Sequence, residues 1–185
     1  MTLQELVKKE YIENDNTLCF KTTSITKIVI LSILTCGFYD YILLLTYWKT
    51  LKENFGYNVS PFWRGFVFGG FTNFKLFPLF KKYFENFNTK FANGTVLALL
   101  FFICAGIVNK IASETMSLEK TNWTLELASL SFRLVSTIIL AYIQSKINKT
   151  NETYFPNAIR NKWGVANTIW AIISATLLII SYLPE

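Results

Sequence analysis

Residues 25–48 read ITKIVILSILTCGFYDYILLLTYW, an almost continuous apolar run with polar residues on both sides. A run of this length is enough for one helix to cross roughly 30 Å of hydrocarbon. Tyr47 and Trp48 close the run, as aromatic residues often do at a membrane–water interface. The run therefore predicts a first membrane span, and this span carries one acidic residue, Asp40.

Three further apolar runs follow, at about residues 95–111, 123–147 and 163–183. Trp123 and Trp163 mark their ends in the same way. A helix is the expected form, because backbone polar groups in lipid must bond to one another. The predicted fold class is all-α: one polytopic membrane bundle of four spans over residues 1–185, beginning with a polar segment at 1–24.

The composition agrees with a membrane protein. Of the 185 residues, 52% are hydrophobic and only 16% are charged, whereas soluble domains carry about 25% charged residues. The net charge of +6 is spread between apolar runs, which favours contact with anionic lipid headgroups over nucleic acid. We therefore expect membrane lipids as partners and no nucleic acid.

The sequence lacks the common signatures of catalysis. It contains no histidine, which excludes a histidine-dependent triad or relay. Cys19, Cys36 and Cys104 lie in separate segments without a CxxC pair, which argues against a zinc site or a disulfide framework. Nucleotide-binding and hydrolase motifs are also missing. We therefore expect a protein that is not an enzyme and needs no metal or cofactor.

Residues 61–91 are predicted to form an amphipathic helix in the headgroup plane, with its phenylalanines in the membrane. The phenylalanines recur at spacings of three and four, namely at positions 77, 80, 84, 87 and 91. At 100° per residue they share an arc of about 80°. The candidate headgroup contacts are Arg64, Lys75, Lys81, Lys82 and Lys90. The glycine-rich stretch at 66–71 leaves a re-entrant segment or a fifth span open.

The lysines and arginines predict the sides of the loops. Residues 81–90 carry three of them, residues 110–122 two, and residues 146–162 four. Because cytoplasmic loops are enriched in basic residues, the first and last of these loops are expected inside and the middle one outside. The N-terminus is then outside with four spans and inside with five.

Three ionisable residues fall inside the apolar runs: Asp40, Glu126 and Arg133. Glu126 is close to Trp123 and is expected at the interface. Arg133 lies about 15 Å below Trp123 at 1.5 Å per residue, close to mid-bilayer. Asp40 and Arg133 are therefore a candidate intramembrane polar pair. They are expected to form a buried ion pair, to line a conduction or substrate path, or to reach water separately.

The motifs Thr35-Cys36-Gly37-Phe38-Tyr39, Trp48-Lys49 and Ser60-Pro61-Phe62-Trp63-Arg64 resemble those of an uncharacterised family of small bacterial polytopic membrane proteins. That family has a Thr-Phe-Gly-Leu-Tyr-like motif in the first span and a Ser-Pro-Phe-x-Arg-like loop. This chain departs from the pattern at Cys36, where phenylalanine is usual. The resemblance implies a membrane architecture and no particular activity.

The leading expectation is a non-enzymatic, multi-pass protein of the bacterial inner membrane that acts through lipid or protein partners or through self-association. The alternative is a small oligomeric transporter or channel with Asp40 and Arg133 in its pathway. An enzyme that acts on lipids is a third and weaker alternative, because the sequence offers it no nucleophile motif.

Overall fold

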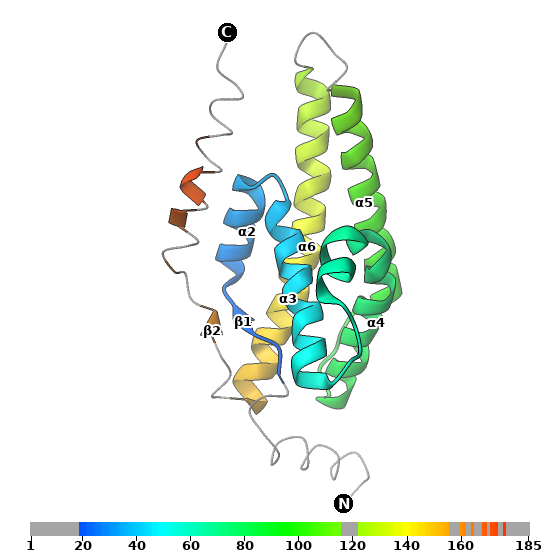
Figure 1. The fold of residues 1–185 in the computed structure, drawn as a ribbon, viewed down its shortest axis with the longest axis vertical. Helices are drawn as coiled ribbons and strands as arrows, with labels where there is room; N and C mark the ends of the chain where they lie inside the picture. Colours follow the sequence, from blue (N-terminus) through cyan, green and yellow to red (C-terminus); the bar gives the residue numbers. More distant parts are fainter. Residues whose placement is uncertain are drawn as a thin grey trace, which may run out of the picture.

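The computed structural model describes residues 19–115 and 122–155, together with 160–161, 164, 168–169, 171–173 and 176. The described part is mostly helical, as the all-α prediction requires (Figure 1). Its helices are α2 (Ile25–Leu34), α3 (Phe38–Phe55), the π-helix η1 (Trp63–Val67), α4 (Gly69–Asn86), α5 (Gly94–Thr115) and α6 (Trp123–Tyr154). Two short strands, β1 (Thr22–Thr23) and β2 (Arg160–Asn161), pair in parallel.

Helices α5 and α6 are long and apolar enough to cross a membrane. They run side by side and form the tallest part of the described structure (Figure 1). In the most apolar 18-residue stretch of each helix, only 17% of α5 and 39% of α6 is buried inside the protein. Helices in the core of a soluble protein would be mostly buried, so these outward-facing apolar surfaces support membrane association.

These two helices correspond to the predicted spans at residues 95–111 and 123–147. The other two predicted spans have different outcomes. The first one does not form as predicted, as described next. The fourth, at residues 163–183, lies mostly outside the described residues, and so does most of the polar segment at residues 1–24.

The prediction of one continuous helix over residues 25–48 was wrong, because a turn at residues 35–37 separates α2 from α3. The backbone N–H of Gly37 donates to the carbonyl of Ser32 at 2.7 Å, a bond that closes the C-terminus of α2. Cys36 and Gly37 have positive φ angles of 50° and 85°. A left-handed pair of residues reverses the chain direction, and glycine adopts that conformation without steric cost.

Helices α2 and α3 therefore form a hairpin whose two open ends lie together (Figure 1). The side chain of Asn54 donates to the carbonyl of Cys19 at 2.8 Å, and the rings of Phe20 and Phe55 are 5.3 Å apart. A spanning helix would instead have put these ends on opposite sides of the bilayer. Sequence patterning missed the turn because the residues on both sides of it are equally apolar.

The hairpin lies against α6 over about half of that helix. Its base contacts α6 at Asn148, which bonds to Thr23, and its turn contacts α6 at Arg133, which bonds to Cys36. These two positions of α6 are separated by about 22 Å at 1.5 Å per residue. The longer arm of the hairpin, α3, has 18 residues and is about 27 Å long at the same rise, slightly less than the roughly 30 Å of a bilayer's hydrocarbon core.

The phenylalanine stripe of residues 77–87 packs inside the protein, so its predicted burial in lipid was wrong. Phe77, Phe80, Phe84 and Phe87 are at most 3% exposed. The ring of Phe80 lies 4.9 Å from that of Phe20 and 5.0 Å from that of Tyr47. The stripe joins α4 to α3 and to the segment before α2. The period of the pattern was informative, but it could not distinguish a protein partner from lipid.

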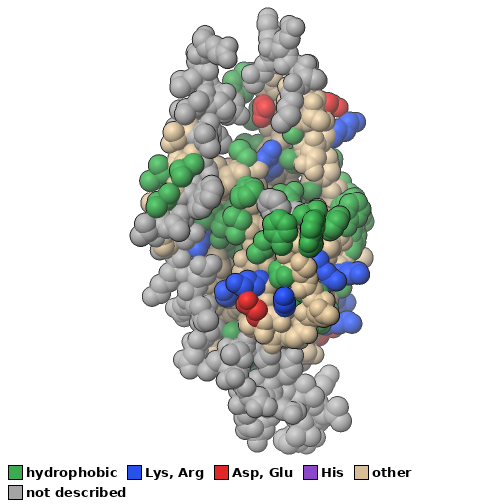
Figure 2. Space-filling model, in the orientation of Figure 1, with side chains coloured by type: hydrophobic (Ala, Val, Ile, Leu, Met, Phe, Trp, Pro, Cys, Tyr) green, Lys and Arg blue, Asp and Glu red, His purple; other side chains and the backbone are tan. Residues whose placement is uncertain are grey.

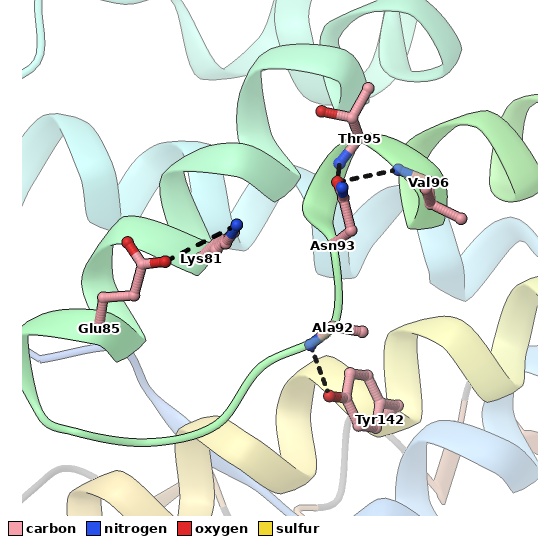
Figure 3. A network of polar contacts seen from close by, with 7 residues as sticks. All are labelled: Lys81, Glu85, Ala92, Asn93, Thr95, Val96 and Tyr142. Carbon is pink, nitrogen blue, oxygen red and sulfur yellow. Dashed lines mark hydrogen bonds and ion pairs between the residues drawn. The ribbon is translucent and has the colours of Figure 1, made fainter.

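Hydrogen bonds fix the segment that connects α4 to the start of α5. Figure 3 shows Asn93 just before α5, where its side-chain oxygen accepts from the backbone N–H groups of Thr95 and Val96 at 3.0 and 3.4 Å. The hydroxyl of Tyr142, on α6, accepts from the N–H of Ala92 at 3.0 Å. These bonds satisfy N–H groups at a helix start that have no partner within the helix.

Exposed aromatic residues gather at η1 and the beginning of α4 instead. This aromatic surface consists of Phe62, Trp63, Val67, Phe68 and Phe71, which are 46–69% exposed. Figure 2 shows hydrophobic side chains in a band on this face, with lysine and arginine side chains below it. Such an arrangement is typical of a protein surface at the edge of a bilayer.

Candidate functional site

The candidate site lies where the α2–α3 turn meets α6. The guanidinium of Arg133 donates to the backbone carbonyl of Cys36, and its Nε donates to the hydroxyl of Ser129 at 3.4 Å. Cys36 lies in the turn between α2 and α3, outside both helices, so its carbonyl is not used in a helical hydrogen bond. Arg133 therefore stabilises the turn and at the same time depends on it for its own position.

Asp40, in the first turn of α3, is buried close to Arg133 but does not form an ion pair with it. Its carboxylate accepts hydrogen bonds from the hydroxyls of Ser32 and Thr137, the second at 3.4 Å. Among the described residues, ion pairs join Lys49 to Glu53, Lys81 to Glu85 and Lys110 to Glu114, all of them away from this site. The structure thus brings both predicted residues to one site and gives each of them hydrogen-bond partners of its own.

Three cavities follow one another around this site. The cavity between α2 and α6, of about 300 Å³, is lined by Cys36 and Arg133, among others. A second, of about 170 Å³, shares these two residues and adds Asp40, Tyr41 and Asn109. The third, of about 450 Å³, shares Tyr41 and Asn109 and reaches the aromatic surface of η1 and α4. Arg133 and Asp40 therefore lie at the centre of a row of cavities across the bundle.

Hydroxyl groups of α6 contribute most of the remaining polar lining. Ser129 and Thr137 line the first cavity, and Ser136 lines the second. Ser131, by contrast, is exposed, and its hydroxyl bonds back to Leu127 on its own helix at 2.8 Å. Small hydroxyls and one guanidinium can hold a polar or anionic group by hydrogen bonds.

A ladder of carboxamides below the site was missed by the sequence reasoning. Gln144 donates to the carbonyl of Lys21 and accepts from the hydroxyl of Tyr47, both at 2.9 Å. Asn148 both donates to and accepts from the backbone of Thr23, at 2.8 and 3.2 Å. Asn151 donates to the carbonyl of Phe20 at 2.6 Å. The ladder binds the extended segment before α2 to α6.

A signal for this ladder was present in the sequence. Gln144, Asn148 and Asn151 are spaced by four and three, so they share a helix face, and Arg133 and Thr137 continue that face toward Trp123. A polar stripe along an apolar helix indicates a face that contacts protein instead of lipid.

The five candidate headgroup contacts have different surroundings. Lys75, Lys82 and Lys90 are exposed, Lys81 is partly buried and is 3.8 Å from Glu85, and the guanidinium of Arg64 lies 5.0 Å from the ring centre of Trp48. A cation over an indole face gains electrostatic attraction. Arg64 therefore has a structural partner within the protein.

The cysteine side chains differ in their exposure. Cys19 and Cys104 are buried, and Cys36 is exposed. Within the described ranges, no group of three or more histidine, cysteine, aspartate or glutamate side chains could hold a metal ion. What the site offers is the guanidinium of Arg133, the carboxylates of Asp40 and Glu126, and several hydroxyls beside mostly apolar cavities.

No family model, no curated protein and no solved structure matches this chain. The resemblance to the small bacterial membrane proteins therefore stays a prediction.

Proposed function

We propose that the chain is a non-enzymatic integral membrane protein, in a bacterial inner membrane, that acts by binding a partner within the bilayer at the Arg133 site. The observation that carries the proposal is the position of that site. Its polar groups lie on α6, a helix of membrane-spanning length, beside cavities that are otherwise mostly apolar. A cation at such a depth is energetically costly to bury, so an arginine there usually marks a functional or structural site.

We further propose that α5 and α6 cross the bilayer, whereas the α2–α3 hairpin enters and leaves on one side. The charges support this orientation. The end of the bundle that holds the base of the hairpin carries basic residues on α3, α4 and α6, namely Lys49, Lys52, Lys81, Lys82, Lys146 and Lys149. The opposite end of α5 has Lys110 beside Glu114. The basic end is the cytoplasmic one by the positive-inside rule, which puts the segment before α2 inside.

Thiol labelling in whole cells tests this topology. In a variant whose three cysteines are replaced by alanine, single cysteines are introduced at the exposed positions Lys21, Glu53, Glu152 and Lys110. A membrane-impermeant maleimide is expected to label Lys110→Cys in intact cells. The other three positions are expected to react only after the membrane is permeabilised, because they lie at the basic end.

The pair Lys21→Cys and Glu53→Cys is decisive, because these positions flank the α2–α3 hairpin. Reaction of the two from opposite sides would restore the single span at residues 25–48 and contradict the hairpin topology. Labelling of Lys110→Cys and Glu152→Cys from the same side would contradict the crossing of α5 and α6. Circular dichroism of each purified variant, which reports helix content, serves as the control for folding.

A small transporter or channel is the second candidate. The row of three cavities favours it, because Arg133 lines the first two and Asp40 lines the middle one. If this candidate is right, wild-type protein in vesicles will conduct an ion or solute, and Asp40→Asn or Arg133→Gln will abolish the flux without loss of helix content. Flux no greater than that of protein-free vesicles would rule this function out.

A further inference from the structure

The cavity between α2 and α6 has two chemically distinct parts. Ile33, Leu127, Leu130 and Leu134 form an apolar wall, and Arg133 lies beside it together with the hydroxyls of the site. Leu127 and Leu130 are also partly on the outer surface, at 63% and 44% exposure. The wall therefore continues from the cavity to the apolar outside of α6, which gives a hydrocarbon chain an entry from the bilayer.

Arg133 has donors left for an anion. A guanidinium carries five N–H groups in a planar fork. Two of them are directed at Cys36 and Ser129. Within the described part of the chain, the remaining ones have no hydrogen-bond acceptor. A carboxylate can accept two parallel hydrogen bonds from such a fork, and these charge-assisted bonds are about twice as strong as neutral ones.

The carboxylates around the cavity do not occupy the free N–H groups of Arg133. Both oxygens of Asp40 accept hydrogen bonds, from Ser32 and Thr137, and no ion pair joins Asp40 to Arg133. Glu126 lines the same cavity but lies seven residues earlier on α6, about 10 Å along the helix axis. Its negative charge disfavours an anion at that end, whereas the guanidinium attracts one at the Arg133 end.

The cavity volume limits the size of the ligand. Ligand sites commonly enclose about 300–1,000 Å³, and this cavity, at about 300 Å³, is at the lower limit. One hydrocarbon chain with a small head group fits such a space better than a two-chain lipid does.

From these observations we propose that the cavity between α2 and α6 binds a single-chain carboxylate amphiphile, a fatty acid, with its carboxylate on Arg133 and its chain along the leucines of α6. This inference rests on the proposed function, since it takes the site to be inside the bilayer. It adds to that function the chemical class of the partner.

Trp123 lines the same cavity and provides a local probe. A fatty acid with bromine atoms on its chain is titrated into the purified protein in detergent micelles, and the quenching of tryptophan fluorescence is followed. The saturable part of the quenching is expected to disappear in Trp123→Phe. The brominated alcohol of the same chain length is expected to bind about tenfold more weakly, because it lacks the charge that Arg133 pairs with.

Substitutions test separately how the charge of Arg133 and the apolar wall contribute to binding. Arg133→Gln is expected to weaken fatty-acid binding about tenfold or more, with partial recovery in Arg133→Lys. Lys110→Gln, which removes an exposed cation from the same end of the bundle, is expected to leave binding unchanged. Because Arg133 also holds the α2–α3 turn, Leu127→Phe with Leu130→Phe provides a second test that keeps the guanidinium. It narrows the cavity and is expected to reduce binding at unchanged helix content.

Equal binding of the acid and the alcohol would overturn the inference, and so would full binding by folded Arg133→Gln. Equally tight binding of a brominated two-chain anionic phospholipid would also overturn it. Saturable quenching that survives Trp123→Phe would also contradict it, because the ligand would then lie elsewhere. In each of these cases, the thiol-labelling pattern decides separately whether the proposed membrane topology stands.

Discussion

Replacement of Phe80 by alanine is expected to lower the free energy of unfolding by about 3–5 kcal/mol, the usual cost of removing a buried phenylalanine side chain. Phe80 is 1% exposed and packs against the rings of Phe20 and Tyr47. Its removal leaves a cavity where α4, α3 and the segment before α2 meet. Unfolding of the purified protein in detergent, followed by circular dichroism, measures the loss.

Phe71→Ala is the matched control, because Phe71 belongs to the same helix but is 69% exposed. The expected loss of stability in detergent is below about 1 kcal/mol, as for surface substitutions in general. If Phe71→Ala were as destabilising as Phe80→Ala, the assignment of the phenylalanine stripe to the protein interior would be wrong. The original expectation, in which the stripe lies in lipid, would then be restored.

Gly94→Ala is expected to destabilise the protein by about 1–3 kcal/mol, the range for overpacking at a close contact. A Cβ atom at this position would lie 2.5 Å from the carbonyl oxygen of Phe77 and 2.7 Å from the nitrogen of Pro78. Both are backbone atoms of α4, so the first turn of α5 must move away from α4 to make room. The same unfolding measurement in detergent detects the change.

Gly106→Ala provides the control on the same helix. Among the described residues, apart from the neighbouring backbone of α5 itself, nothing lies within 4 Å of a Cβ atom placed at Gly106. Alanine is the better helix former by about 0.5–1 kcal/mol, so this variant is expected to be as stable as wild type or slightly more stable. A destabilised Gly106→Ala together with an unchanged Gly94→Ala would contradict the close packing of Gly94 against the backbone of α4.

The candidate site was only partly predictable. Asp40 and Arg133 stood out because each is a charge within an apolar run, where an ionisable side chain is rare. Whether the two would pair could not be read from the sequence. That depends on the turn at residues 35–37, which puts Ser32 against Asp40 and the carbonyl of Cys36 against Arg133. Each of the two has hydrogen-bond partners of its own, in place of the ion pair that was one of the three alternatives.

The sequence by itself determined the class of the fold and the two long apolar helices. The reason is that helix formation and the length of an apolar segment depend on local composition and on the period of 3.6 residues. It also determined that the phenylalanines of residues 77–87 form one apolar stripe. Only the tertiary structure decided that this stripe faces the protein and that residues 25–48 turn back on themselves. The physical reason is that an apolar side chain gains similar free energy from lipid and from a protein core. Its preference for one of them is decided by contacts that are distant in the sequence, such as those of Phe20 with Phe80 and of Asn148 with Thr23.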